Sequence, residues 1–193
     1  EVYPELSTRR VLALSFEPGL KLEAFLATQP SLALREATAR RLLDLFFREF
    51  FEWGLVQTDA NFANFLFRPD SDELVLLDFG ATREYPQGFI DQYRDLLLAC
   101  FEGDVAETVR IGQALQLIDP RESDESRRDL FALIYAVLGV FRPENQPFDF
   151  APSAFVQSTA ALLHKYYKGL QFSAPPAQLI FLHRKLGGIG AVT

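Results

Sequence analysis

Residues 57–85, QTDANFANFLFRPDSDELVLLDFGATREY, constrain the fold most, because two aspartates lie beside apolar runs where an unpaired charge is costly to bury. The runs FLFR and ELVLLD resemble short strands, and the PDSD between them is a strong turn signal. The pattern therefore predicts a β-hairpin, with Asp59 and Asn64 before its first strand and Asp78 at the end of its second. We expect the two acids to converge on something positively charged.

The spacing of these polar residues is typical of a kinase-type site, in which D-x-x-x-x-N precedes a hairpin that ends in D-F-G. A phosphoryl donor carries concentrated negative charge, and Mg²⁺ neutralises it through hard oxygen ligands, one or two of them from the protein. Asn64 and Asp78 are the candidate metal ligands. Asp59 is the candidate catalytic residue, as a base or as an orienting group for the attacking hydroxyl or water.

Two neighbours of Asp78 have expected structural roles. Phe79 is expected to pack into the helical core and hold the backbone of Asp78, and Gly80 to permit the turn that follows. The alternative is an ordinary surface loop, with an Asx turn at Asp59 and a strand-end carboxylate at Asp78.

The rest of the chain is predicted to be mostly helical, which gives an α+β, mainly helical fold. RRVLALSF (9–16) predicts a strand that ends at Pro18 and Gly19, and Ser31 is expected to cap a long helix that runs toward Gly54. Prolines at 143, 147 and 152 are expected to break the later helices, and glycines 187 and 188 to end the last one. The expected helices are 21–28, 32–53, 88–101, 104–116, 122–141, 152–168 and 175–187.

Composition excludes several functions. The chain has 193 residues, enough for one domain, and a net charge of −7 with no basic stripe, so a nucleic-acid partner is not expected. The single cysteine, Cys100, predicts a buried inert thiol, and with only His164 and His183 a zinc site is not expected. No signal peptide or membrane-spanning run is visible, so we expect a soluble or peripheral protein. The missing initiator Met indicates processing or excision from a longer chain.

The motif QTDANFANFLF…LVLLDFGATREY, together with LHRKLGG at 182–188, resembles the UbiB family of atypical kinase-like proteins of coenzyme Q (ubiquinone) biosynthesis, in its eukaryotic-type branch. The likeness extends from about Val11 to Gly188. It implies the C-terminal lobe of a protein-kinase-like fold with a short hinge strand and a catalytic β-hairpin, so that 1–193 is one kinase-like C-lobe. Residues 1–20 would be the last N-lobe strand and the hinge, and 21–193 the helical lobe; the N-lobe itself would be absent.

The resemblance also implies site roles. Asp59 would be the catalytic-loop acid, Asn64 and Asp78 the Mg²⁺ ligands, and the backbone of the hinge would meet adenine at three residues, Ser15, Phe16 and Glu17. Cofactors would be ATP and Mg²⁺. The family is associated with ATPase activity and ubiquinone production, so the implied partners are lipid or quinone-precursor ligands and other ubiquinone-biosynthesis proteins, with peripheral membrane contact. The location would be mitochondrial in a eukaryote, and cytoplasmic or at the membrane in a bacterium.

Some residues depart from the family pattern. Ser15 stands where the family usually has an acid, and the loop has Ala60, Phe62 and Ala63 in place of Pro, Trp and Ser. No lysine-bearing strand, phosphate-covering loop or KxGQ-type segment precedes Arg9, so the chain alone is expected to be inactive. No A-P-E follows the D-F-G, which argues against a protein substrate.

Two other functions remain open. One is a small-molecule phosphotransferase of the aminoglycoside- or choline-kinase kind, which Gln57 disfavours because that group usually has His at this place. The other is a non-enzymatic kinase-like scaffold that binds lipid or partner proteins. The intact trio of Asp59, Asn64 and Asp78 argues against a decayed site.

Overall fold

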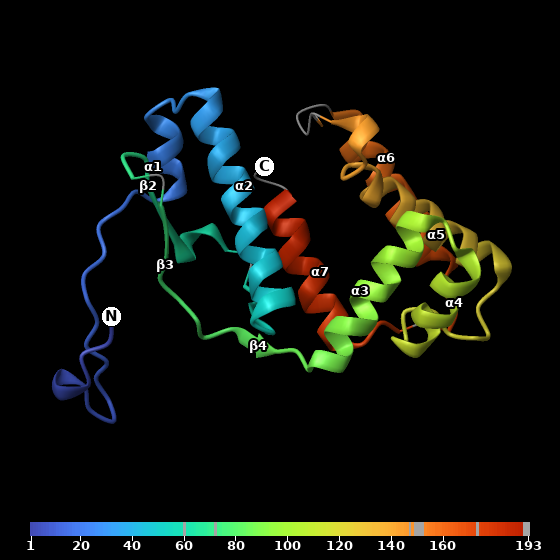
Figure 1. The fold of residues 1–193 in the computed structure, drawn as a ribbon, viewed down its shortest axis with the longest axis horizontal. Helices are drawn as coiled ribbons and strands as arrows, with labels where there is room; N and C mark the ends of the chain where they lie inside the picture. The colour runs from blue at the N-terminus through green and yellow to red at the C-terminus, as the bar shows by residue number, and fades with distance from the viewer. Residues whose placement is uncertain (60, 72, 147, 149–152, 173, 191–193) are drawn as a thin grey trace. The chain divides into compact units, whose positions relative to one another are not determined.

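The computed structural model describes residues 1–190 except 60, 72, 147, 149–152 and 173 (Figure 1). The chain divides into two compact units. The first unit comprises Glu1–Phe47, Gln57–Thr82 and the described part of Lys185–Thr193, and the second comprises Arg48–Val56 and Arg83–Arg184. The expected breaks at Pro147 and Pro152 lie outside the described residues.

The described elements are mostly helices, with two sheets of two strands each. The α+β, mainly helical class therefore agrees with the sequence, and the helices begin and end close to the expected positions. In chain order the elements are η1 (Pro4–Leu6), α1 (Leu22–Ala27), α2 (Leu32–Phe47), the π-helix η2 (Arg48–Glu52), β1 (Leu55–Gln57), η3 (Phe62–Asn64), β2 (Phe65–Arg68), β3 (Glu73–Leu76), β4 (Thr82–Glu84), α3 (Gln87–Glu102), α4 (Val105–Ala114), α5 (Asp124–Gly139), η4 (Pro143–Asn145), α6 (Ser153–Gly169) and α7 (Ala177–Gly190).

Side-chain caps set several helix starts. Ser31 accepts a hydrogen bond from the backbone N–H of Leu34 at 3.2 Å, as expected for a cap of α2. Asp104 caps α4 and Ser123 caps α5 in the same way. The chain leaves η2 through Gly54, whose φ of +65° lies in the left-handed region, and an added Cβ there would come within 3.1 Å of a backbone oxygen.

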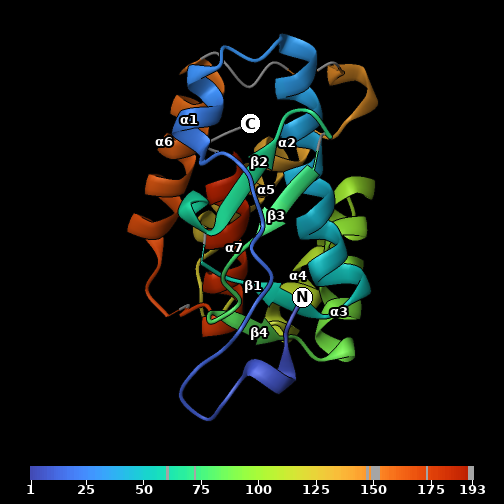
Figure 2. The same cartoon turned by 90° about the vertical axis from the view of Figure 1, so that its left-hand side faces the viewer.

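The β2–β3 hairpin (residues 65–76) contributes buried aromatic side chains to the first unit. Its strands pair antiparallel from Phe65 opposite Leu76 to Arg68 opposite Glu73. Phe65 and Phe67 are buried, and the Phe67 ring stacks on Phe25 of α1 with 5.2 Å between centroids. Figure 2 shows the chain passing beside β2 before it enters α1, where the backbones of Leu20 and Phe67 exchange hydrogen bonds of 2.9 and 2.8 Å.

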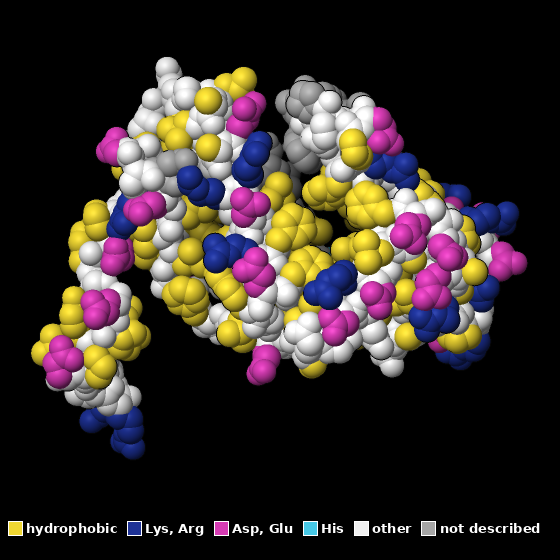
Figure 3. All heavy atoms as spheres, viewed as in Figure 1, with side chains coloured by type: hydrophobic (Ala, Val, Ile, Leu, Met, Phe, Trp, Pro, Cys, Tyr) yellow, Lys and Arg dark blue, Asp and Glu magenta, His cyan; other side chains and the backbone are white. Residues whose placement is uncertain are grey.

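The N-terminal arm (residues 1–16) differs from expectation. Residues 9–16 form no strand; the arm has only the isolated bridges Val2–Leu14 and Thr8–Val11, because it folds back and pairs with itself. Its large apolar side chains lie on the surface (Figure 3). These are Val2, Leu6, Val11, Leu12, Leu14 and Phe16.

The second unit has a helical core. Helix α3 packs against α4 and α5, and α5 packs against α6 (Figure 1). Cys100 lies in this core with its Sγ 3.7 Å from the Thr108 hydroxyl, and burial raises the pKa of its thiol. The predicted buried thiol is thus confirmed. The buried cluster consists of Leu96, Cys100, Ile111, Leu115, Leu117, Ile118, Leu130, Leu138, Tyr166 and Leu179.

An aromatic group surrounds Phe50 in the same unit. The Phe50 side chain is fully buried and contacts Tyr85 and Tyr93 edge to face, at centroid distances of 5.4 and 5.3 Å. The Tyr93 hydroxyl lies 3.0 Å from Nε2 of His183 on α7. His183 therefore has a structural partner in the second unit.

Helix α7 continues past the glycines expected to end it. It runs to Gly190, and Ile189 in its last turn is only 4% exposed, so packing of this apolar side chain favours one more turn. The expected helix end at Gly187 and Gly188 was wrong. None of the helices within the described residues is long and apolar enough to cross a membrane.

Replacement of Gly103 by Ala tests how the end of α3 is held. Gly103 has a φ of +75°, and an added Cβ would lie 3.3 Å from the Tyr135 hydroxyl. We expect Gly103→Ala to lower the free energy of unfolding by about 1 kcal/mol or more. The matched control, Gly88→Ala at the start of the same helix, meets nothing within 4 Å. It should leave stability unchanged or raise it by about 0.5 kcal/mol. Urea denaturation measures both; equal effects would contradict this account of Gly103.

Candidate functional site

The site loop (residues 57–64, with 60 undescribed) brings the first two predicted site residues together. Asn61 starts η3 by accepting the N–H of Ala63 at 2.9 Å. The short turn of η3 returns the chain toward Asp59, so Nδ2 of Asn64 donates to Oδ2 of Asp59 at 2.9 Å. The N–H of Asn61 also donates to Oδ1 of Asp59, at 3.3 Å. Asp59 and Asn64 are thus one hydrogen-bonded pair.

The Asp78 segment (residues 77–81) is attached to this loop along its length. The N–H of Leu77 donates to the carbonyl of Asn64 at 2.9 Å, directly beyond the last pair of the hairpin. The side-chain amide of Gln57 donates to the carbonyl of Asp78 at 3.3 Å. The Thr58 hydroxyl and N–H both donate to the carbonyl of Ala81, at 2.8 and 3.1 Å. Four hydrogen bonds therefore attach the backbone of the Asp78 segment to the site loop.

The donor set at this place suits Mg²⁺. The Asp78 carboxylate is exposed and uses Oδ1 to accept the N–H of Gly80 at 2.7 Å. Because Nδ2 of Asn64 faces Asp59, its amide oxygen Oδ1 is turned away from that carboxylate. Among the described residues, no three His, Cys, Asp or Glu side chains are grouped closely enough to hold a metal by themselves. A Mg²⁺ site completed by phosphate oxygens and water needs only one or two carboxylates.

Phe79 does not pack as expected. Its side chain is 62% exposed, so the prediction that it enters the core was wrong. Hydrogen bonds hold the segment instead: the N–H of Gly80 closes a turn on Asp78, and the N–H of Thr82 donates to the carbonyl of Phe79 at 3.1 Å. The Asx-type bonds of the surface-loop alternative are present at Asp59 and Asp78, and backbone hydrogen bonds attach the two segments to each other.

One of the three predicted hinge residues, Glu17, contacts the hairpin at its opposite end. The Ser15 hydroxyl donates to Oε1 of Glu17 at 2.8 Å, and Oε2 of Glu17 accepts from Arg68 of β2 at 2.6 Å. These two hydrogen bonds, first from Ser15 and then from Arg68, lower the pKa of Glu17. Phe16 between them is 90% exposed.

Two residues of the site had no role assigned from the sequence. Gln57 and Thr58 are each only 3% exposed and connect the site loop to the Asp78 segment. Oε1 of Gln57 is a buried oxygen without a hydrogen-bond partner in the structure. One feature of the sequence could have identified them: these two polar residues directly follow the apolar Leu55–Val56 and precede Asp59.

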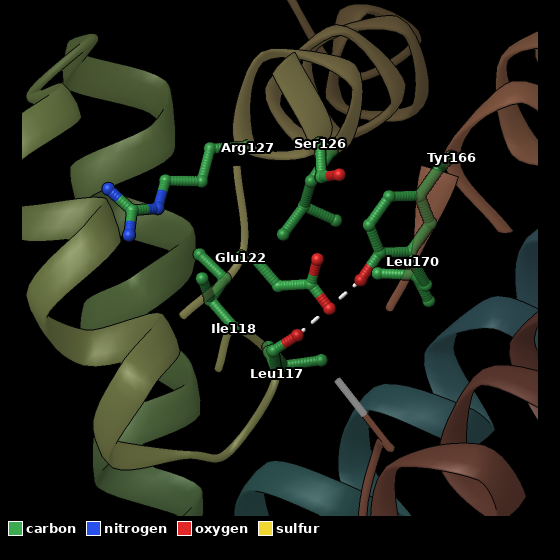
Figure 4. A pocket seen from close by; sticks show the side chains of 8 residues that line it. Leu117, Ile118, Glu122, Ser126, Arg127, Tyr166 and Leu170 are labelled. Carbon is green, nitrogen blue, oxygen red and sulfur yellow. Dashed lines mark hydrogen bonds between the residues drawn. The ribbon is translucent and has the colours of Figure 1, made fainter. Parts of the chain in front are cut away.

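A small cavity lies elsewhere, in the second unit (Figure 4). Its volume is about 10 Å³, room for a water molecule but far too small for a nucleotide. Glu122 points into it and accepts the backbone N–H of Phe172 at 2.7 Å. The Tyr166 hydroxyl, whose pKa burial raises to about 12, donates to the carbonyl of Leu117 at 3.4 Å. The hydrogen bonds of Glu122 and Tyr166 hold the backbone around this cavity in place. The residues that line the cavity include none of the predicted site residues.

A mainly helical fold with a loop acid and asparagine before a hairpin and a second acid directly after it is typical of kinase-like proteins. Comparison with known proteins agrees: residues 1–111 match the ABC1 atypical kinase-like domain. The chain therefore belongs to the ABC1 family of atypical kinase-like proteins, which confirms the predicted UbiB-type relationship.

Similar proteins are described as atypical kinases. The chain is 30% identical over 188 residues to "Atypical kinase COQ8B, mitochondrial" of Danio rerio, covering 97% of this chain and 30% of that protein. It is 29% identical to "Atypical kinase coq-8, mitochondrial" of Caenorhabditis elegans, covering 97% and 25%. It is 27% identical to "Atypical kinase COQ8, mitochondrial" of Saccharomyces cerevisiae, covering 97% and 37%. The chain thus spans between a quarter and about two fifths of these relatives.

Replacement of Asn64 by Asp tests the Asp59–Asn64 pair. The variant puts two carboxylates where the structure has an amide donating at 2.9 Å, so they repel and one retains its proton above the pH at which an unfolded Asp, with a pKa of about 3.9, loses it. A folded-state pKa above the unfolded value means that stability is lost as pH rises. We expect Asn64→Asp to be about 1–2 kcal/mol less stable than wild type at pH 8, with the difference shrinking toward pH 4.

The control for this test is Asn61→Asp. Asn61 acts through its acceptor oxygen on the N–H of Ala63, and an aspartate preserves that acceptor. Denaturant titrations at several pH values should show little change for this control. A pH-independent effect of Asn64→Asp, or equal effects of the two variants, would rule out the paired geometry.

Proposed function

We propose that this chain is the catalytic-loop lobe of an atypical kinase-like ATP-binding protein, an ATPase of the UbiB type that supports ubiquinone biosynthesis. The observation that carries the proposal is the hydrogen-bonded pair Asp59–Asn64, attached beside Asp78 by the backbone and by Gln57. Membership of the ABC1 atypical kinase-like family supports it.

Each site residue has a defined task in this proposal. Asp78 and Asn64 would hold Mg²⁺ through their side-chain oxygens, and the bound ion would supply positive charge to neutralise the ATP phosphates. Asp59 accepts a hydrogen bond from the attacking hydroxyl or water and orients it toward the terminal phosphorus. The amide of Asn64 holds the carboxylate of Asp59 in place for this by donating to its Oδ2.

The adenine site is proposed at the hinge, where the backbone of Ser15, Phe16 and Glu17 would contact the base. Residues 1–20 would supply this hinge, and residues 21–193 the helical lobe. The exposed apolar side chains of the N-terminal arm, Phe16 among them, support contact with further protein. We therefore expect ATP turnover only when this lobe is joined to a lobe that supplies a lysine and a phosphate-covering loop.

The substrate is proposed to be a lipid or quinone precursor, or water beside such a ligand. Only residues 79–86 separate Asp78 from the start of α3 at Gln87, too few for a long peptide-docking segment. Similar proteins named above are described as mitochondrial, and we propose that location, with peripheral membrane contact and other ubiquinone-biosynthesis proteins as partners.

The first test is removal of the metal ligand. In the intact protein that carries this chain, Asp78→Asn should weaken Mg-ATP binding at least about tenfold, since a charged oxygen ligand becomes neutral. Asp70→Asn, in the turn at the other end of the hairpin, is the matched control and should bind as wild type. Isothermal titration measures both affinities, and circular dichroism confirms folding. Unchanged affinity in folded Asp78→Asn would refute the metal-ligand assignment.

The second test concerns the phosphoryl acceptor. Phosphate release by the intact protein should rise when a quinone-like phenol or lipid vesicles are added, because a ligand that prefers the active arrangement of the protein shifts the population toward it. Asp59→Asn should abolish the release in every condition. Equal rates in all conditions, together with stoichiometric phosphorylation of an amino-alcohol, would favour the small-molecule phosphotransferase instead.

A further inference from the structure

Arg68, the last residue of β2, makes three contacts that reach two separate parts of the first unit. Its Nε donates to the carbonyl of Pro18 at 2.8 Å, and its Nη2 donates to Glu17 at 2.6 Å. On the other side, its Nη1 donates to Oε2 of Glu73 on β3 at 3.0 Å. One guanidinium therefore joins the hinge segment (residues 15–20) to the β2–β3 hairpin.

The chemistry of these contacts requires arginine. A guanidinium presents several N–H donors in one rigid plane, so it can serve two carboxylates and a carbonyl at once, whereas the single ammonium of Lys acts as a point charge. Hydrogen bonds raise the pKa of Arg68 and lower those of Glu17 and Glu73, so all three groups are ionised at neutral pH. The Arg68 side chain is about one quarter exposed, and its partners Glu17 and Glu73 are more open to water, at 38% and 57%.

The hinge segment is also pressed against the same strand by its backbone. Leu20 and Phe67 exchange two backbone hydrogen bonds. At Gly19 an added Cβ would lie 2.7 Å from the Cβ of Leu66, closer than side-chain contacts normally come. The segment is thus held at Leu20 by the backbone of β2 and at Glu17 and Pro18 by the side chain of Arg68.

We propose that Arg68 is a positioning residue for the base of the bound nucleotide: it fixes the backbone of Ser15–Glu17 against the hairpin whose other end carries Asn64 and Asp78. This inference rests on the proposed function. Binding the phosphates at one end of the hairpin and the base at the other requires a fixed separation, and Arg68 supplies it by coupling the hinge to β2. Without Arg68, the hinge would still exist but would have to be ordered when the base binds.

The experiment separates binding of the base from binding of the phosphates. The intact protein and its variants Arg68→Gln, Arg68→Lys, Glu17→Gln and the Glu17→Gln/Arg68→Gln double variant are titrated with adenosine and, separately, with Mg-pyrophosphate. ATP turnover gives KM and kcat for each. Arg110→Gln is the matched control, because Arg110 also pairs with a glutamate, donating to both oxygens of Glu107 on α4 at 2.6 and 2.7 Å, in the second unit.

We expect Arg68→Gln to weaken adenosine binding and to raise the KM for ATP about three- to tenfold, with kcat and Mg-pyrophosphate affinity nearly unchanged. Glu17→Gln should weaken adenosine binding by a smaller factor, and the double variant should be no worse than Arg68→Gln, since the two residues act together. Arg68→Lys should fall between wild type and Arg68→Gln. Arg110→Gln should match wild type.

Several results would overturn the role of Arg68. These are wild-type adenosine affinity in Arg68→Gln, equal weakening of both probes, and an equal effect of Arg110→Gln. If Arg68→Gln does not fold, Arg68→Lys and Glu17→Gln decide the question by the same ratio of adenosine to pyrophosphate affinity. If wild type binds neither probe and Asp78→Asn does not differ from it, the proposed function fails, and the inference fails with it.

Discussion

The register of β2 against β3 is the constraint on which the candidate site depends. Phe65 opposite Leu76 is the last strand pair, and the next hydrogen bond joins the carbonyl of Asn64 to the N–H of Leu77. A slip of one residue would displace Asp78 relative to Asn64 by about 3.4 Å and would turn the buried Phe65 and Phe67 toward solvent. Burial of two aromatic rings therefore also sets the distance between the two proposed metal ligands.

Asp78 lies beside an apolar run without its charge being buried, because the apolar side chains and the carboxylate point to different sides. The apolar side chains of β2 point into the first unit, whereas the carboxylate of Asp78 stands outside the hairpin end and is exposed. Two buried polar groups that hold the site together are neutral: Gln57 and Thr58 hydrogen-bond to carbonyls of the Asp78 segment. A neutral hydrogen-bonded group is far less costly to bury than a charge. Neutral buried groups therefore connect the site loop to the Asp78 segment, while the carboxylate of Asp78 stays accessible to a ligand.

Local sequence patterns predicted much of this arrangement. Contacts between residues that are distant in sequence could not be predicted in the same way. The helices, the cap at Ser31, and the strands on either side of PDSD follow from residue type and short-range spacing, which act within a few residues. A strand at 9–16 needed a partner that local sequence does not specify, and the arm paired with itself. The outward position of Phe79 and the pairing of Glu17 with Arg68, 51 residues apart, likewise depend on tertiary placement. In the site, the acids were visible because their spacing is local; the groups that orient them were not, because Gln and Thr occur in many environments.

Two large exposed side chains of the first unit could contribute to binding if a partner covered them. Phe16 is 90% exposed beside the proposed adenine contacts, and Phe79 is 62% exposed next to the proposed metal ligand Asp78. Covering a phenylalanine side chain that was open to water contributes about 1.5–3 kcal/mol. The polar frame of Asp59, Asn64 and Asp78 is already connected by hydrogen bonds, so ordering it requires little further free energy. Apolar contact at Phe16 and Phe79 can therefore strengthen the association of further protein or of a ligand with this unit, while the hydrogen-bonded frame would determine where the phosphates of the proposed nucleotide lie.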